Sequence, residues 1–145
     1  MSNGDEQAVI EATHSFYAAL NAMLAGDPDP LADVYSHAAD VTYMPAEGGL
    51  LVGWDQVFGD WSRQAEASRG GTAEPREVRA VAGGGMACSL ALTSGTVTGT
   101  DGVTREVHLR ESCVFRKEGE SWKMIAHHAD AIRAWDEVVE ERRPA

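Results

Sequence analysis

The stretch CVFRKEGESWKMIAHHAD (residues 113–130) has the pattern of the last hairpin of an antiparallel sheet. Two runs of mainly apolar and aromatic residues flank the turn sequence EGES, residues 118–121. The second run, which we expect to form a strand over residues 122–131, carries two adjacent histidines, His127 and His128. Neighbouring side chains of a strand point to opposite faces of its sheet, so only one of the two histidines can face the interior.

The turn predicts how the two strands pair. If Lys117 lies opposite Trp122, each later pair follows by counting, and opposed residues share a face. One of the two resulting faces is mainly apolar and should cover the core. It consists of Leu109, Glu111, Cys113 and Phe115 on one strand and of Trp122, Met124, Ala126, His128 and Asp130 on the other. The sequence therefore predicts that His128 faces inward and His127 outward.

A preceding hairpin is predicted at TDGV (residues 100–103), because Asp-Gly is a strong signal for a two-residue turn. This turn would join a strand over residues 86–98 to a strand over residues 104–117. Its register adds Cys88, Leu90 and Leu92 to the predicted inner face.

Ionisable side chains gather at one end of this face, namely Glu111, His128 and Asp130. Buried charges are costly unless they are paired, and a carboxylate can fix the tautomer of a neighbouring imidazole. We therefore expect a general acid–base unit in which His128 carries the proton and a carboxylate orients it or acts as the base. The alternative is that the buried histidine–carboxylate pair has only a structural role.

Other side chains should complete a pocket at this end of the face. Tyr17, Tyr43 and Trp61 could supply a hydroxyl donor or aromatic walls. The expected substrate-binding set is Tyr17, Tyr43, Trp61, Leu90, Cys113 and Met124. We expect no metal and no cofactor, since the ionisable residues lack the spacing of a dedicated metal site.

The rest of the chain predicts an α+β domain with its helices on one face of the sheet. Apolar residues at steps of three and four indicate helices near residues 5–24 and 55–67, with a short helix after GDPDP (residues 26–30). Short strands are expected at VTYM (residues 41–44) and LLVG (residues 50–53), and a longer one over residues 74–82. Residues 131–145 have the spacing of a terminal helix.

Composition favours one domain over residues 1–145, with 43% hydrophobic residues. The formal net charge of −11 disfavours binding to nucleic acid or to anionic membranes. We see no apolar run long enough to span a bilayer and no signal peptide. The two cysteines, Cys88 and Cys113, lack metal-type spacing, and a reduced, cytoplasmic protein is expected.

The order of elements resembles the NTF2-like superfamily, and most closely its SnoaL-like and ketosteroid-isomerase-like branches. The matching stretches are SFYAALNAMLAGDPDPLADVYSHAADVTYMP, GLLVGWDQVFGDW and CVFRKEGESWKMIAHHAD, which together cover most of residues 8–130. The resemblance implies a cone-shaped domain with a hydrophobic cavity and a homodimer formed through the outer sheet face. It does not imply one chemistry, because this fold carries many activities.

Departures from the family patterns argue against two activities. The three catalytic positions of ketosteroid isomerases appear as Met44, Phe16 and Cys113, none of which can replace the groups required. The R-x-D motif of limonene-epoxide hydrolases would fall on Arg110 and Glu111, which are adjacent and cannot share a face. Cyclases of the SnoaL type use a cavity carboxylate as base without a cofactor, a role that Asp130 or Glu111 could fill.

We therefore expect a cofactor-independent acid–base enzyme, a cyclase, isomerase or dehydratase, acting on a small, apolar carbonyl compound. The alternative is a non-catalytic ligand-binding or assembly module of the same fold. A ligand in the cavity would discriminate between them.

Overall fold

This computed structural model describes residues 3–132 and 142, which form three helices and six strands. In chain order they are α1 (Asn3–Leu24), α2 (Asp29–Val34), β1 (Thr42–Met44), β2 (Leu51–Val52), α3 (Trp54–Ala67), β3 (Gly71–Gly83), β4 (Met86–Thr98), β5 (Thr104–Glu118) and β6 (Ser121–Ala131). The sheet has the order β2-β1-β6-β5-β4-β3, with a parallel β1–β6 pair and otherwise antiparallel pairs. The predicted α+β class is confirmed.

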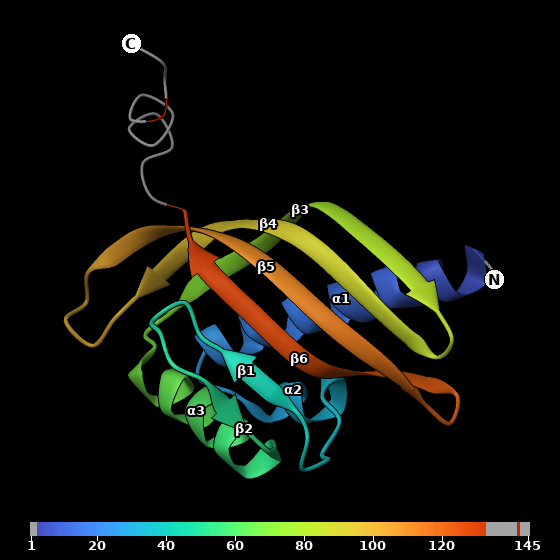
Figure 1. The fold of residues 1–145 in the computed structure, drawn as a ribbon. Coiled ribbons are helices and arrows are strands. Elements are labelled where there is room, and N and C mark those ends of the chain that lie inside the picture. The colour runs from blue at the N-terminus through green and yellow to red at the C-terminus, as the bar shows by residue number, and fades with distance from the viewer. Residues whose placement is uncertain (1–2, 133–141, 143–145) are drawn as a thin grey trace.

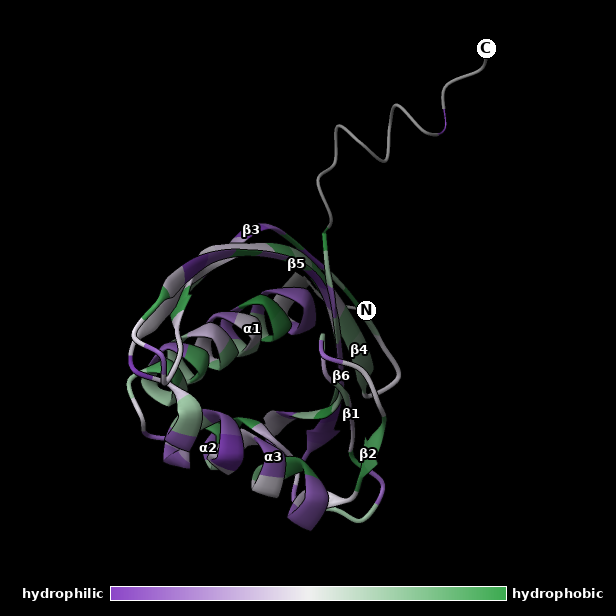
Figure 2. Ribbon diagram, turned by 90° about the vertical axis from the view of Figure 1, so that its left-hand side faces the viewer, coloured by the Kyte–Doolittle hydropathy of each residue, from purple (hydrophilic) through white to green (hydrophobic). Residues whose placement is uncertain are grey.

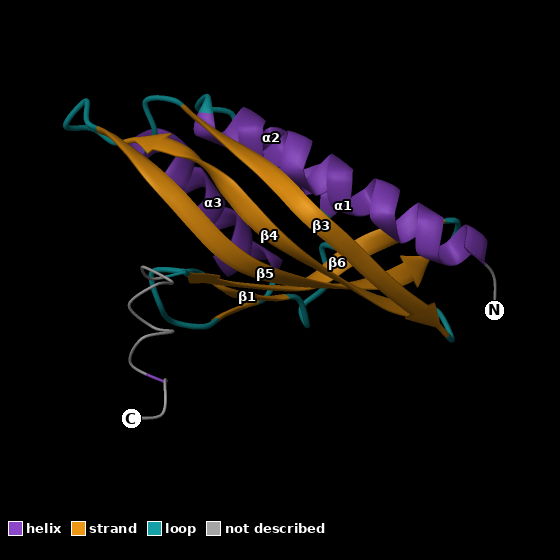
Figure 3. Cartoon of the chain, turned by 90° about the horizontal axis from the view of Figure 1, so that it is seen from above, coloured by secondary structure: helices purple, strands orange, loops and turns teal. Residues whose placement is uncertain are grey.

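The sheet is strongly curved and wraps around α1. Figure 1 shows β3 to β6 side by side in front of α1, with α2 and α3 below, and Figure 2 shows α1 inside the curve with α2 and α3 across the open side. Seen from above, the sheet remains open, with β3 at one edge (Figure 3). The helices and the concave face of the sheet therefore enclose one core, to which all the long strands contribute.

Helix α1 presents one apolar stripe to this core. Its buried residues recur at the spacing of a helical face and include Val9, Thr13, Phe16, Leu20 and Met23. The helix ends before Gly26, whose φ of 105° is a left-handed conformation that favours glycine. These contacts fix α1 beneath β3 and β4 and thereby set the depth of the space between helix and sheet.

Glycine permits the close approach of β3 and β4. Gly95 pairs with Ala73, and a Cβ atom at Gly95 would lie 1.8 Å from the backbone oxygen of Thr72. Any other residue at position 95 would therefore push the two strands apart. The two strands can approach each other at this point because the side chain is missing.

The β5–β6 hairpin begins with the predicted register and then departs from it. Lys117 lies opposite Trp122 and Phe115 opposite Met124, but the next pair is Val114 with Ala126. Ile125 is thus an extra residue in β6, a β-bulge, and it inverts the alternation of every later side chain. His127, not Ala126, consequently lies opposite Cys113 and faces inward.

The predicted orientation of two site residues is therefore wrong. His128 is exposed on the outer face, and Asp130 lies there beside Arg110. The inward orientation of Glu111 and Cys113 is confirmed, because the bulge changes β6 and leaves the alternation of β5 intact.

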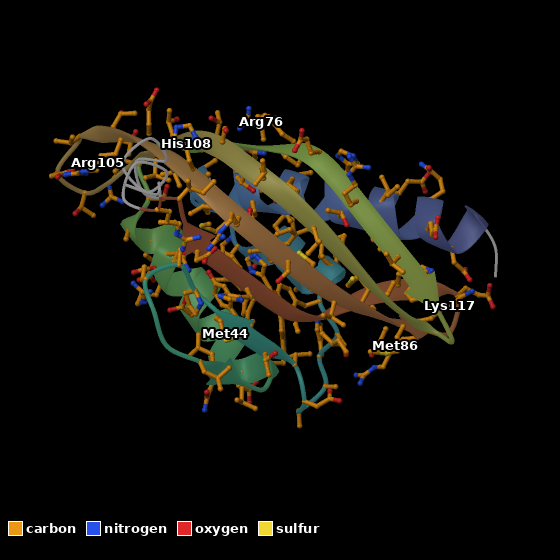
Figure 4. The ribbon with its side chains drawn as sticks, turned by 45° about the horizontal axis from the view of Figure 1, so that its top comes forward. Met44, Arg76, Met86, Arg105, His108 and Lys117 are labelled. Carbon is orange, nitrogen blue, oxygen red and sulfur yellow. The ribbon has the colours of Figure 1, made fainter. Side chains whose placement is uncertain are left out.

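The β4–β5 hairpin also differs from the prediction. Thr98 pairs with Thr104, so its loop has five residues, 99–103, in place of a two-residue turn. The pairing of β4 with β5 is therefore shifted by one residue from the predicted register. The shift turns Leu90 outward, where it is 52% exposed, and turns Ala91 inward opposite Glu111. The assignment of Leu90 to the pocket is wrong for this reason. Figure 4 labels Arg105 near this hairpin and Lys117 near the other end of β5.

None of the described helices has the length and hydropathy needed to cross a bilayer. The predicted terminal helix falls largely on residues 133–141 and 143–145, which lie outside the described residues.

Candidate active site

A cavity of about 130 Å³ lies between α1, α3 and the concave face of the sheet. Its walls are mainly apolar and include Leu20 and Met23 of α1, Ala129 of β6, and Val107 and Leu109 of β5. An apolar cavity of ~150 Å³ can hold a benzene molecule. The cavity thus has the size for a compound with one six-membered ring.

The polar side chains that line this cavity come from one helix, five strands and the β1–β2 loop, and they are Tyr43, Glu47, Gln64, Thr72, Thr93, Glu111 and His127. Glu111 and His127 lie on the adjacent strands β5 and β6, and both are almost completely buried, at 5% and 2% exposure. His127 Nε2 is 2.7 Å from Glu111 Oε1. The bulge at Ile125 is what brings this imidazole to the carboxylate.

Glu111 is held as a carboxylate by three donors. Besides His127, Tyr17 Oη donates to Glu111 Oε2 at 2.8 Å, and the Thr93 hydroxyl donates to the same oxygen. The two hydroxyls lie 2.6 Å apart and carry two protons, enough for both bonds to Glu111. Burial raises the pKa of Glu111, but the hydrogen bond and charge of His127, with these hydroxyls, lower it below its usual value.

Aromatic rings fix the His127 imidazole. Tyr43 stacks on it at a centroid distance of 5.1 Å and an angle of 14°, and Trp61 stacks on Tyr43 at 4.5 Å. Phe16 meets the His127 ring edge-on at 4.8 Å. These contacts, together with Glu111, leave the imidazole a single orientation, because apolar rings and one hydrogen bond surround it.

The second ring nitrogen of His127 is unpaired. Nδ1 is buried, and the described residues offer it no hydrogen-bond partner. Tyr35 Oη and Trp61 Nε1 are buried and unpaired too, but these two groups neighbour each other, since Trp61 acts on the pKa of Tyr35. When Nε2–H donates to the Glu111 carboxylate, Nδ1 of a neutral imidazole carries a free lone pair. The arrangement can therefore accept a proton at Nδ1.

A chain of hydrogen bonds and ion pairs connects Tyr43 to Glu47, another residue of the cavity lining. Gln64 Nε2 donates to Tyr43 Oη at 3.1 Å and to Asp60 Oδ2 at 2.8 Å. Arg63 pairs with Asp60 at 2.8 Å and with Glu47, in the β1–β2 loop, at 3.7 Å. Burial raises the pKa of Tyr43 strongly, so its hydroxyl stays protonated and can donate.

The expected substrate-binding residues have different positions. Tyr43 and Trp61 line the cavity. Tyr17 contacts Glu111 from α1, whereas Cys113 and Met124 are buried in the core outside the cavity lining. Leu90 lies on the opposite side of the sheet.

Sequence reasoning missed His127 as the inner histidine and also missed Thr93 and Gln64. One signal was present for His127, because Met124, Ile125 and Ala126 are three consecutive apolar residues that break the alternation of a strand and mark a bulge. Thr93 and Gln64 gave no signal, since both residue types are common on strands and helices.

Within residues 3–132 and 142, no group of three His, Cys, Asp or Glu side chains is placed to hold a metal ion. Three residues of the cavity lining carry side chains of ligand type, Glu47, Glu111 and His127, and the last two bond to each other. The polar groups of the cavity therefore suit hydrogen bonding and proton transfer.

The chain is similar to several solved structures. One is a candidate dehydratase of the NTF2-like family from Streptomyces avermitilis, with 20% identity, coverage of 91% of this chain and 99% of that chain, and a TM-score of 0.80. Another is a candidate scytalone dehydratase from Novosphingobium aromaticivorans, with 12% identity, 89% and 85% coverage, and a TM-score of 0.76. A third is a candidate calcium/calmodulin-dependent protein kinase II association domain from Thiobacillus denitrificans, with 21% identity, 84% and 93% coverage, and a TM-score of 0.70.

At these identities the likeness shows the fold alone. No curated protein matches the chain. The profile of the SnoaL-like domain family matches residues 10–132, which include every residue of the cavity. The chain belongs to the SnoaL-like domain family, a branch of the NTF2-like superfamily.

Proposed function

We propose that this protein is a cofactor-independent acid–base enzyme that acts on a small, largely apolar carbonyl compound. The observation that carries the proposal is the buried Glu111–His127 pair, which lines an apolar cavity and whose buried Nδ1 atom has no partner among the described residues. A buried polar atom without a partner is uncommon, and in a cleft it favours a functional role.

The roles of the two residues follow from their partners. Glu111 accepts three hydrogen bonds and has a lowered pKa, so it is a weak base and acts by orienting His127. His127 is the proton carrier, because Nδ1 can accept a proton while Glu111 stabilises the imidazolium that forms. Glu111 thus keeps its role from the sequence hypothesis, and His127 takes the role expected for His128.

The reaction begins with a proton transfer next to a carbonyl group. Nδ1 of His127 takes a proton from the carbon beside the carbonyl, and the electron pair of the broken C–H bond moves onto the carbonyl oxygen. The Tyr43 hydroxyl, which accepts from Gln64 and keeps its own proton, donates a hydrogen bond to that oxygen. An apolar wall favours this step, since water would otherwise compete for both groups.

The proton can then return in three ways. Its return to another carbon gives an isomerisation, and its return to a departing hydroxyl group gives water and a dehydration. Attack of the enolate on a second carbonyl of the same molecule gives a cyclisation, with the proton passing to the new alkoxide. None of the three needs a cofactor, and the names of two similar structures refer to dehydratases.

The experiment uses cyclohexanone as a probe in D2O, with the exchange of its α-hydrogens followed by NMR. We expect the wild-type protein to accelerate exchange and the variant His127→Gln to lose about 100-fold or more of that rate, the usual contribution of a general base. His128→Gln is the matched control, with an expected change below about twofold, because the exposed ring is outside the cavity.

The competing function is a ligand-binding or assembly module without catalysis. It is favoured if cyclohexanone or another small ketone binds in the cavity and exchanges at the same rate as in buffer. Circular dichroism of each variant shows whether a lost rate reflects a lost fold.

A further inference from the structure

We infer that the cavity selects uncharged single-ring compounds that carry a hydroxyl group besides the carbonyl, and that it rejects carboxylates of the same size. The inference rests on the proposed function in taking this cavity as the substrate site. It adds two roles. Gln64 recognises the hydroxyl group by a hydrogen bond, and the negative charges of Glu111 and Glu47 disfavour anionic ligands.

The first step concerns charge. None of the described residues that line the cavity is Lys or Arg, whereas Glu111 and Glu47 both line it. Glu111 is ionised in the interior, where its charge is poorly screened. Arg63, which is not part of the cavity lining, is already paired with Asp60 at 2.8 Å and with Glu47 at 3.7 Å. An anionic ligand would therefore lose its hydration without gaining a lysine or arginine partner, and the His127 imidazole, which can become a cation, is already bonded to Glu111.

The second step concerns the amide of Gln64. A carboxylate can only accept hydrogen bonds, so the atom that bonds to Asp60 must be Nε2, and this fixes the orientation of the amide. The same Nε2 donates to Tyr43 Oη. The carbonyl oxygen Oε1 of Gln64 has no hydrogen-bond partner among the described residues. Because Gln64 lines the cavity, this oxygen is left as an acceptor for a ligand.

Tyr43 and Gln64 thus offer a matched pair of groups. The Tyr43 oxygen accepts from Gln64 and its proton is left to donate, while Gln64 Oε1 is left to accept. A carbonyl oxygen satisfies the first group, and a hydroxyl proton satisfies the second. A site built to bind a hydroxyl group discriminates strongly against a compound without one, because its polar atoms are then left unpaired.

The third step concerns size. The cavity of about 130 Å³ is bounded by α1 and α3 on one side and by the sheet on the other. It fits one ring, and a fused second ring would have to displace core side chains, which is costly in a close-packed interior.

The test uses four ring ketones of similar size with the wild-type protein, and dissociation constants from NMR titration at neutral pH. They are cyclohexanone, 4-hydroxycyclohexanone, 4-oxocyclohexanecarboxamide and 4-oxocyclohexanecarboxylate. The amide and the carboxylate have the same shape and differ in charge. We expect the carboxylate to bind on the order of 100-fold more weakly than the amide, because like charges meet in a poorly screened site.

The recognition of the hydroxyl group by Gln64 is tested with the variant Gln64→Leu. The ratio of the dissociation constants of cyclohexanone and 4-hydroxycyclohexanone should favour the hydroxy compound by about tenfold in the wild type and fall towards one in the variant. Equal binding of amide and carboxylate, a wild-type ratio near one, or no binding of any neutral probe at millimolar concentration would each overturn the inference.

The result is separable from that of the proposed function. If the neutral probes bind selectively and their α-hydrogens exchange at the buffer rate, the proposed catalysis fails and the selectivity stands. If exchange is accelerated and the carboxylate binds as well as the amide, the catalysis stands and the selectivity fails.

Discussion

The two neighbours His127 and His128 place similar chemistry on opposite faces of one sheet. Inside, His127 bonds to Glu111 at 2.7 Å, and both side chains are buried. Outside, His128 lies near the ion pair of Arg110 and Asp130, which is 2.6 Å long and open to solvent. Water screens the outer charges, and exposed ion pairs contribute ~0–1 kcal/mol. The inner pair is fixed because both side chains are buried and Glu111 bonds only to His127 and to the hydroxyls of Tyr17 and Thr93 among the described residues.

The same comparison shows that volume is a poor guide to the site. The outer face carries a shallow depression of about 390 Å³ that includes Leu90, Arg110 and His128, larger than the inner cavity of about 130 Å³. The groups around it are already paired or solvated. The smaller cavity is lined by His127, whose buried Nδ1 atom is unpaired, so burial identifies the candidate site better than size does.

The largest expected effect comes from breaking the inner pair. Glu111→Ala leaves His127, Tyr17 and Thr93 without their common partner, and we expect the free energy of unfolding to fall by about 3–5 kcal/mol. Asp130→Ala is the matched change on the outer face and should cost less than about 1 kcal/mol. Urea denaturation of both variants measures this, and equal losses would contradict the contrast between the faces.

The next effect tests the close approach of β3 and β4 at Gly95. Gly95→Ala would place a methyl group 1.8 Å from the Thr72 oxygen, so β3 and β4 must move apart, at a cost of about 1–3 kcal/mol. Gly83→Ala is the control, because Gly83 has open space around its Cβ position. A Gly95→Ala melting temperature equal to that of the control would mean that the close approach does not exist.

The pH dependence of stability should distinguish the faces next. The folded-state pKa of Glu111 is lowered, so its stabilisation is present above the ordinary value of 4.5 and is lost as pH falls through the folded value. Glu111→Gln should therefore flatten the fall in unfolding free energy below pH 4.5. Asp130→Asn should change the slope less, although Arg110 lowers the pKa of Asp130 as well, because this pair is screened. If the unfolding free energies of the wild type and of Glu111→Gln fell in parallel below pH 4.5, the lowered pKa of Glu111 would be refuted.

The smallest effect on the fold is expected on the outer face. We propose that a second copy of the chain covers it, since Val81, Leu90 and Met44 are exposed there and the adjacent charges of Arg110 and Asp130 suit a twofold contact. Leu90→Asp should convert a dimer to a monomer in sedimentation at micromolar concentration while the melting curve of the monomer keeps its shape. A wild-type protein that sediments only as a monomer would contradict this.

Much of the fold was predictable because local patterns determine it. The periodicity of α1 and the turn after Lys117 gave the helix, the last hairpin and the inward orientation of Glu111 and Cys113. The site was less predictable, because one extra residue, Ile125, reverses all side chains beyond it. The Asp101–Gly102 pair predicted a two-residue turn, but the loop has five residues. Asp101 accepts from the Val103 N–H and pairs with Arg105, which stabilises the longer loop.

The orientation of the two histidines is tested most directly by side-chain NMR of ¹⁵N-labelled protein at mildly alkaline pH, with His127→Gln and His128→Gln used for assignment. The account predicts that His127 carries its proton on Nε2, with slow solvent exchange and an unprotonated Nδ1, while the His128 ring proton exchanges rapidly with water. A protected His128 together with a rapidly exchanging His127 would contradict it and would move the candidate site to the other face of the sheet.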